Sequence, residues 1–461
     1  MLEPSENNVG LALICRGQFP LHPYHDLSLL GKLVRDALLN GGLGVKDADA
    51  PLVDIIEPGM TVLLKPNWVL HYNKSGKTMD CMITHPNFIL CVLKEVLKGK
   101  PSKILIGDAP IQNADFDSIM ATGSDELLKF AASYKCIEIR DLRNLVSQQI
   151  NGEWIITHDL RPRERSVSFD LGQNSMLEPV SLPSGRFRNT NYNPDDMVNR
   201  QSPGIHEYSL CKEPFEADVI INLPKLKAHG KAGITAALKN IVGFIADKNY
   251  LPHHRVGGSR LGGDCYPGLN IGKRLAEYFL DQANRNKTGR TYHFLKSMSN
   301  IMLMPSSTSD KLGLEGVWYG NDTVWRMVLD LNRILLYGNI DGKLSNTPLR
   351  TIFTLTDGII AGERNGPLAP EPVRLGAITF GTNSAFIDIA HSALMRFDWN
   401  SIPLIRESFK VKQHPLAHEK PEELLIADGK EVYSFAEAAK ELGVDFEPPL
   451  GWKGHIEFTR H

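Results

Sequence analysis

Apolar and polar positions alternate along the chain in a way that predicts strands and helices in turn. Short runs rich in branched apolar residues are typical of buried strands, and longer segments show helical spacing of apolar positions. The predicted strands are 9–15, 61–65, 103–107, 136–140, 218–223, 351–356, 375–380 and 424–427. The predicted helices are 26–40, 86–98, 125–134, 271–284, 322–335, 384–394 and 434–442. This alternation predicts an α/β fold with mostly parallel sheets flanked by helices.

The pattern changes near residues 150–211, where shorter strand-like runs are broken by turn residues. Such runs predict an antiparallel insertion. We therefore divide the chain into an N-terminal α/β part, an antiparallel insertion, a core α/β part with the candidate site, and a C-terminal strand-helix extension. Their boundaries are 1–150, 151–211, 212–403 and 404–461.

The most distinctive stretch follows the predicted strand 218–223. Lys225, Lys227, His229 and Lys231 stand at alternate positions there, so an extended backbone points them to one side. We expect a small, apolar helix to begin soon afterwards. A strand end, a glycine-bearing basic loop and a helix N-terminus together favour a bound anion. This stretch therefore predicts an anion site.

The lysine and histidine beside that predicted helix suggest proton chemistry. We expect the helix to begin near Thr235 and to carry Lys239 about one turn inside. Apolar surroundings and neighbouring lysines lower the pKa of a lysine, which favours a nucleophilic or proton-transferring amine. His229 is suited to proton transfer near neutral pH.

Other polar clusters stand at predicted strand ends, where ligands bind in parallel α/β sheets. We expect Asp108, with His229 and Lys239, to be catalytic. If Asp108, Asp357 and Glu363 converge, they could bind a divalent metal through oxygen ligands or act as bases. The predicted substrate-binding residues are Lys65, Asn67, Lys225, Lys227, Thr235, Asn240, Asp357, Gly358, Glu363, Asn365 and Gly366.

Asp388 and His391 are three residues apart on a predicted helix and are therefore neighbours on one face. Asp388 stands among apolar residues. It is either a capped or paired structural residue or a group facing the site, and the sequence leaves both readings open.

The amino-acid composition limits the kinds of partner and cofactor that we expect for this protein. The chain has 461 residues and a formal net charge of −2, which gives no general attraction to nucleic acid or membrane. We see no signal peptide or membrane-spanning run and expect a cytoplasmic protein. The six cysteines form no Cys-x-x-Cys motif, so we expect no iron–sulfur cluster. A homo-oligomer is compatible with the sequence.

The stretch PKLKAHGKAGITAALKNIVG, residues 224–243, resembles the signature of the domain of unknown function 362 family. Many members of that family carry ferredoxin-type cysteine repeats, which this chain lacks. The resemblance covers roughly residues 62–403. Its other marks are LLKPNWV at 63–69, THP at 84–86, IGDAP at 106–110, DGIIAGERNGP at 357–367 and the segment 381–403.

A second, local resemblance concerns chemistry. His229 and Lys239, with nine residues between them that include Gly233, are similar to a segment of nickel-pincer lactate racemases. In those enzymes the lysine attaches the pincer nucleotide and the histidine serves in catalysis. The resemblance implies a nickel-pincer nucleotide on Lys239, with His229 as an acid or base. His229, His253 and His254 are the corresponding candidates for metal ligands.

Three functions agree with these patterns. The first is an isomerase or epimerase acting on a small, anionic, hydroxylated substrate. The second is a metal-assisted group transfer on a nucleotide or sugar phosphate, as in polysaccharide assembly. The third is a non-catalytic ligand-binding protein with the basic loop as receptor.

Overall fold

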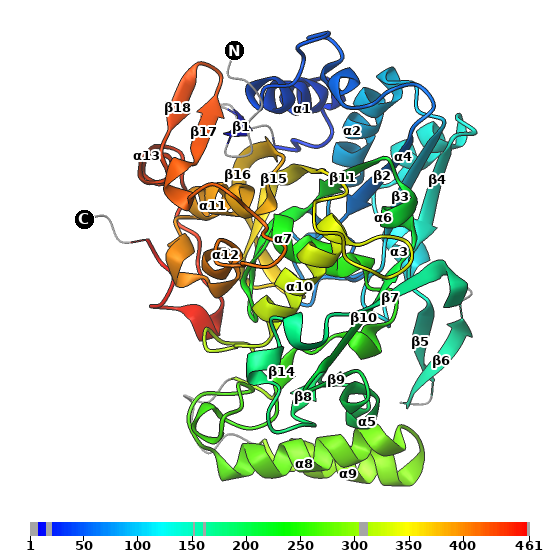
Figure 1. Cartoon of the computed structure of the whole chain (residues 1–461), viewed down its shortest axis with the longest axis vertical. Coiled ribbons are helices and arrows are strands. Elements are labelled where there is room, and N and C mark those ends of the chain that lie inside the picture. The colour runs from blue at the N-terminus through cyan, green and yellow to red at the C-terminus, as the bar shows by residue number, and fades with distance from the viewer. Residues whose placement is uncertain (1–7, 15–20, 151–152, 160–162, 304–311, 459–461) are drawn as a thin grey trace.

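The structure of the chain is a computed structural model that describes residues 8–14, 21–150, 153–159, 163–303 and 312–458. One large sheet lies at its centre (Figure 1). Its main strands are β1 (Asn8–Leu13), β2 (Thr61–Pro66), β3 (Lys103–Asp108), β4 (Ile137–Asp141), β11 (Val219–Leu223), β15 (Ile352–Asn365), β16 (Ala369–Gly381), β17 (Leu425–Asp428) and β18 (Glu431–Tyr433).

The strand order in this sheet is β18-β17-β1-β16-β15-β11-β2-β3-β4. From β15 to β4 all neighbouring strands run parallel, and only β16 and β18 introduce antiparallel pairs along the path. Two short strands extend the sheet beside the carboxyl end of β11: β12 (Lys225–His229) pairs with β15, and β13 (Gly233–Thr235) pairs with β12. The predicted α/β fold with a mostly parallel sheet is confirmed.

Apolar side chains alternate between the two faces of the sheet, as the period of two in a strand requires. In β2, Val62 and Leu64 enter one core, whereas Leu63 enters the other. The first core is covered by α1 (Leu27–Asn40), α2 (Pro86–Lys98), α3 (Phe116–Ala121) and α4 (Asp125–Ala132). The second contains side chains from α7 (Ala237–Asn240), α10 (Val324–Tyr337), α11 (Ser384–Met395), α12 (Pro403–Ser408) and α13 (Phe435–Glu441).

The insertion near 150–211 is antiparallel, as predicted. β5 (Leu145–Ile150) and β6 (Glu153–Asp159) form a hairpin. A second sheet has the order β7-β10-β9, with β7 at Ser166–Asp170, β10 at Ile205–Cys211 and β9 at Gln201–Ser202.

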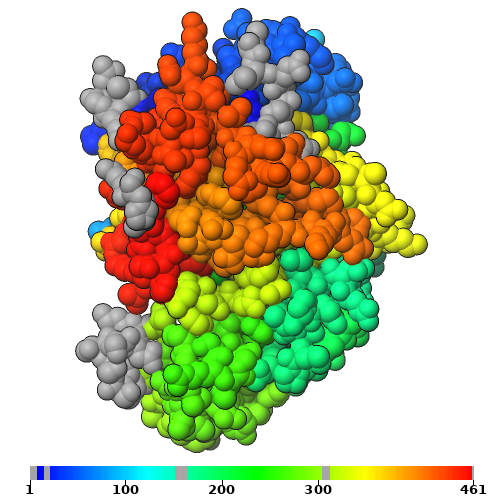
Figure 2. Space-filling view, turned by 60° about the vertical axis from the view of Figure 1, so that its left-hand side comes forward, coloured from blue at the N-terminus to red at the C-terminus, as the bar shows by residue number. Residues whose placement is uncertain are grey.

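The middle of the chain forms the lower part of the molecule in Figure 1. There α8 (Ile271–Asn286) and α9 (Gly289–Met302) pack side by side. Figure 2 shows the orange and red C-terminal segments on the upper part and the green middle segments below them. The remaining elements are α5 (Pro194–Val198), α6 (Glu213–Glu216), β8 (Phe187–Arg188) and β14 (His254–Arg255). Within the described ranges, no helix has the length and apolar content needed to cross a bilayer.

Two predicted boundaries were wrong. The helix expected near Thr235 begins at Ala237, because Gly233–Thr235 is strand β13. Lys239 therefore lies in the first turn of the four-residue helix α7. The second error concerns β15, which does not end before the turn-rich segment but continues to Asn365, because its hairpin partner β16 pairs with it along that length.

Asp388 caps α7. Its Oδ1 accepts a hydrogen bond from the backbone N–H of Ala237 at 2.7 Å, and its Oδ2 accepts one from that of Leu238 at 3.0 Å. Nδ1 of His391 lies 3.0 Å from Oδ1 of Asp388, as the helical spacing indicated. Asp388 therefore holds the helix N-terminus where we expected an external anion. Of the two readings of Asp388, the structure favours the structural one.

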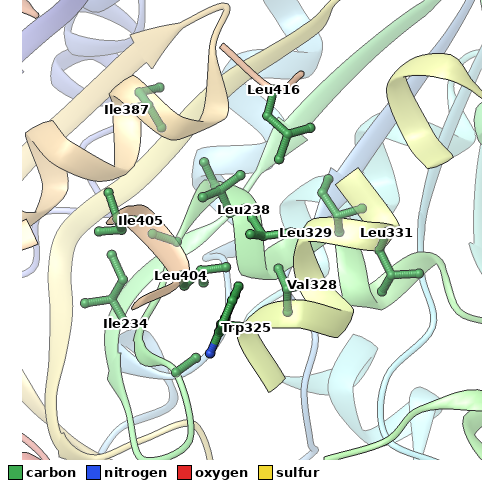
Figure 3. Close-up of a cluster of buried hydrophobic side chains, with 14 of the residues drawn as sticks. Ile234, Leu238, Trp325, Val328, Leu329, Leu331, Ile387, Leu404, Ile405 and Leu416 are labelled. Atoms are coloured by element: carbon green, nitrogen blue, oxygen red, sulfur yellow. The ribbon is translucent and has the colours of Figure 1, made fainter. Parts of the chain in front are cut away.

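Apolar packing also holds α7 in place. Leu238 lies among apolar side chains from neighbouring helices, including Trp325 and Leu329 of α10 and Leu404 of α12 (Figure 3). These side chains are almost fully buried. Burial of this kind leaves the backbone beside Lys239 little freedom.

We expect Asp388→Ala to lower the free energy of unfolding by about 3 kcal/mol, because two backbone donors and His391 lose a buried charged partner. Urea unfolding followed by circular dichroism measures the change. Asp388→Asn is the matched control: it keeps one acceptor oxygen and should lose less. A wild-type midpoint for Asp388→Ala would contradict the role of this cap.

Candidate active site at the carboxyl ends of the parallel strands

The family marks, which are far apart in sequence, meet at the carboxyl ends of β2, β3 and β11. Lys65 of β2 and Asp108 of β3 form an ion pair of 2.8 Å, and both side chains are buried. Oδ2 of Asp108 also accepts a hydrogen bond from the backbone N–H of Trp68 at 2.6 Å. Gly243 lies directly against the pair, and a Cβ there would stand 2.4 Å from Nζ of Lys65. This close packing desolvates Lys65 and lowers its pKa, while Asp108 opposes the shift.

A second buried ion pair links β12 to β15. Nζ of Lys225 lies 2.6 Å from Oδ2 of Asp357 and donates a hydrogen bond to the hydroxyl of Tyr24 at 2.9 Å. The Tyr24 hydroxyl in turn donates to Oδ1 of Asp357 at 2.7 Å. The backbone N–H of His85 donates to Oδ2 at 3.0 Å. The charge of Lys225 is therefore balanced inside the protein.

Lys227 is held without a carboxylate partner. Its Nζ donates a hydrogen bond to Oδ1 of Asn67 at 2.7 Å and another to the carbonyl oxygen of Met82. Asn67 donates to Oδ1 of Asn240 at 2.9 Å, and Asn240 donates to Oδ1 of Asn222 at 2.7 Å. Burial, with help from nearby lysines, lowers the pKa of Lys227 to about 7. Burial therefore leaves this amine partly neutral at neutral pH.

Lys231 and Lys239 are the lysines of this region that keep partial contact with solvent. Among the described residues, neither amino group has a hydrogen-bond or ion-pair partner. The pKa of Lys239 is lowered to about 7, mainly by desolvation and next by the positive charge of Lys231. Desolvation also lowers the pKa of Lys231, against the attraction of Glu315. These two amines are the open part of the cluster.

In the two histidines beside these lysines, the Nδ1 atoms have opposite roles: one accepts hydrogen bonds and the other donates one. Nδ1 of His229 accepts hydrogen bonds from the backbone N–H groups of Lys231 at 3.0 Å and Ala232 at 3.2 Å, so Nε2 carries the proton. Nδ1 of His253 donates to the carbonyl oxygen of Leu251 at 2.9 Å, which leaves Nε2 as an acceptor. Desolvation first, and neighbouring lysines next, lower both pKa values well below 6.5. Both rings are therefore neutral.

These contacts test the nickel-pincer expectation. A histidine binds a metal through an unprotonated nitrogen, and in His229 the only such nitrogen already faces two backbone donors. His229 therefore does not fit the role of a nickel ligand, and we derive no step through that cofactor. His229, His253 and His254 also do not form a compact group of metal-type ligands within the described ranges.

The structure does not bring all predicted site residues together. Glu363 lies six residues beyond Asp357 on β15, about 20 Å along a strand, and Oε2 of Glu363 accepts the backbone N–H of Glu447. The carboxylates of Asp357 and Glu363 therefore do not meet at one site. Asn365 is exposed and accepts the backbone N–H of Leu450. Three other predicted residues are buried in the strands or hairpin near the site: Thr235, Gly358 and Gly366.

The sequence analysis did not select Tyr24, His85 or Lys248 as site residues. Tyr24 and His85 stack at 3.9 Å over the Lys225–Asp357 pair and help line a cavity of about 430 Å³. Lys248 donates hydrogen bonds to the carbonyl oxygens of Ala109 and Ile245, and burial lowers its pKa to about 8. His85 stands within the THP mark, which could have drawn attention to it, whereas no sequence signal points to Tyr24 or Lys248.

The fold and site define an α/β protein with a cluster of buried and half-buried lysines at the carboxyl ends of its parallel strands. A family model described as domain of unknown function (DUF362) matches residues 161–393, about half of the chain. The chain belongs to this family.

Known proteins resemble the chain only in part. A thylakoid-associated protein of Synechocystis sp. is 28% identical over 197 residues, which make up 42% of this chain and 42% of that protein. The chain thus matches under half the length of this relative. A solved protein from Thermotoga maritima has 11% identity and a TM-score of 0.36, with 78% of this chain and 56% of that one covered. The lactate racemase apoprotein from Thermoanaerobacterium thermosaccharolyticum has 12% identity and a TM-score of 0.32, with 78% and 55% covered.

We expect the buried lysines to make stability depend on pH. The pKa of Lys227 falls from 10.5 to about 7 on folding, so the unfolded chain binds more protons between these values. Folding stability should therefore rise with pH in that window, by about 1.4 kcal/mol for each unit of difference in pKa. Lys227→Met removes this contribution, and its stability relative to wild type should be highest near pH 7 and fall toward pH 9.5.

Urea unfolding at several pH values measures this trend. The matched control is Lys129→Met, which removes an exposed lysine of α4. Its difference from wild type should not change with pH. An equally flat difference for Lys227→Met would show that Lys227 stays charged in the folded protein.

Proposed function

We propose that the protein is an isomerase or epimerase that acts on a small hydroxylated carboxylate at Lys231, Lys239 and His229. The observation that carries this proposal is the pair of amines of Lys231 and Lys239, which have no hydrogen-bond or ion-pair partner in the described part of the chain and lie beside a neutral His229. A substrate carboxylate would supply the negative charge that this part of the cluster lacks. The sequence predicted that Lys65, Lys225 and Lys227 bind the anion, but all three are fully buried and have internal partners. Lys231 therefore takes this role in the proposed reaction.

Each side chain has a distinct part in the proposed reaction. The ammonium group of Lys231 pairs with the substrate carboxylate. Lys239, as a neutral amine, takes the proton from the carbon that bears the hydroxyl group, and the electron pair of that bond moves into the carboxylate. The Nε2–H group of the neutral His229 imidazole donates a hydrogen bond to the substrate oxygen on which negative charge develops.

The proton must then return to carbon. A pKa of about 7 keeps both forms of Lys239 populated at neutral pH, which suits a group that takes and returns a proton. His253 supplies a second acceptor through Nε2, and the charges of Lys231 and Lys239 both act on it. The protonated Lys239 returns its proton to the face from which it came, which restores the substrate, or to the other face once the planar intermediate has turned over, which gives its epimer.

Exchange with heavy water tests this function directly. The protein is incubated in D₂O with a panel of small 2-hydroxy acids, and proton NMR follows loss of the carbon-bound hydrogen signal while chiral chromatography follows racemisation. We expect exchange with at least one acid. Lys239→Met should lower its rate by about 100-fold or more, the usual contribution of a general base.

Lys129→Met, an exposed lysine far from this role, serves as the control and should keep the wild-type rate. Circular dichroism confirms that each variant is folded. Full exchange by folded Lys239→Met would refute the proposed base. Binding of an acid by the wild type with no exchange over hours would instead support a non-catalytic ligand-binding protein.

Anion binding can be tested apart from turnover. We expect glycolate at pH 7 to raise the melting temperature of the wild type, because a ligand that binds only the folded state stabilises it by about 2.7 kcal/mol at 100 times its dissociation constant. Glycolamide has the same shape without the charge and should have no effect. Lys231→Met should abolish the shift and Lys129→Met should keep it; an undiminished shift in Lys231→Met would place the anion elsewhere.

A further inference from the structure

Three metal-type side chains that take no part in the proposed reaction lie close together. They are His254 of β14, Cys265 of the following loop and Glu277 of α8. One ligand atom from each lies within 4.8 Å of the other two. All three residues are buried, with exposed fractions of 3%, 1% and 5%.

The state of His254 sets this group apart from an ordinary hydrogen-bonded cluster. Its Nδ1 atom is buried and has no hydrogen-bond partner among the described residues. A buried nitrogen without a hydrogen-bond partner is unfavourable. Hydrogen bonds among the described residues therefore do not account for the burial of this ring.

The carboxylate of Glu277 is already oriented for such a ligand. Both of its oxygens accept the backbone N–H of Gly257, at 2.9 and 3.1 Å. Oε2 also accepts the hydroxyl of Tyr266 at 3.2 Å. Hydrogen bonds of this kind hold metal-binding carboxylates in place and tune their affinity.

The kinds of ligand indicate the metal. One thiolate, one imidazole and one carboxylate suit Zn²⁺, which takes sulfur, nitrogen and oxygen ligands at about 2.0–2.3 Å. Mg²⁺ and Ca²⁺ prefer oxygen ligands alone. Burial and the neighbouring Glu277 keep Cys265 protonated in the free protein, so metal binding would release its thiol proton.

We propose that His254, Cys265 and Glu277 form a zinc site, with one ring nitrogen of His254, Sγ of Cys265 and one carboxylate oxygen of Glu277 as ligands. The site joins β14 and its following loop to α8. The fourth tetrahedral position would be taken by water or a small ligand. Of the three histidines expected as metal ligands, only His254 belongs to this proposed site. Cys265 and Glu277 take the places of His229 and His253.

Cobalt and zinc titrations test the site without reference to activity. The full-length protein is stripped with a chelator under reducing conditions, and Co²⁺ is added alone. We expect one Co²⁺ per chain and a near-ultraviolet charge-transfer band from the Cys265 thiolate. Zn²⁺ should displace the Co²⁺, abolish the band and raise the melting temperature.

Cys265→Ser should lose the band and at least 10-fold in zinc affinity, a loss at the lower end of those seen when metal-site residues are changed. The matched control is Cys136→Ser, which removes a partly exposed free cysteine outside the group and should bind as the wild type does. Glu277→Gln preserves side-chain size and tests the carboxylate if Cys265→Ser does not fold. Absence of the thiolate band in the wild type, or its persistence in Cys265→Ser, would overturn the zinc site.

Discussion

The structure buries several lysines at the carboxyl end of a parallel sheet, and carboxylates neutralise only some of these lysines. Two of them, Lys65 and Lys225, are paired with Asp108 and Asp357 in fully buried ion pairs. Removing one partner from such a pair leaves an isolated charge in a medium of low polarity, which is strongly destabilising. Each pair joins segments far apart in sequence, so the two pairs fix the relative positions of β2, β3, β12 and β15. The rest of the site is built on this frame.

The remaining lysines are not needed for that frame. Lys227 and Lys239 have pKa values lowered to about 7 mainly by burial, and that burial disfavours the folded protein at neutral pH. Proteins retain such destabilising groups chiefly where function requires them. The asparagine network around Lys227 and the neutral rings of His229 and His253 give the cluster a defined pattern of donors and acceptors. A ligand with a carboxylate and a hydroxyl group complements that pattern.

Helix α7 determines where such a ligand can be held. The N–H groups of Ala237 and Leu238 at its N-terminus donate to Asp388, so these two groups are already occupied. In the proposed function, recognition of an anion would therefore depend on lysine side chains. The same cap, together with the apolar packing of Leu238, keeps Lys239 at a fixed position beside the open part of the cluster (Figure 3). A rigid support for a reactive group reduces the reorganisation that a reaction requires.

The sequence by itself determined the features that arise from local periodicity. The alternation in residues 61–65 and 218–223 predicted β2 and β11, and the apolar spacing of 86–98 gave α2 with its observed ends. The strand-end positions of Lys65, Asp108 and Lys225 followed from the same patterns. These features depend on side-chain direction along one short segment, which the order of residues specifies.

Only the tertiary structure decided which charged groups meet. No local pattern shows that Asp357 neutralises Lys225 or that Asp388 caps α7, because each depends on contacts between distant segments. The end of β15 was missed for the same reason: pairing with β16 extends it through residues that are typical of turns. His254, Cys265 and Glu277 share no recognisable spacing and are brought together by the packing of α8 against the loop after β14. Local sequence encodes the elements, whereas burial and long-range pairing decide the electrostatics of the site.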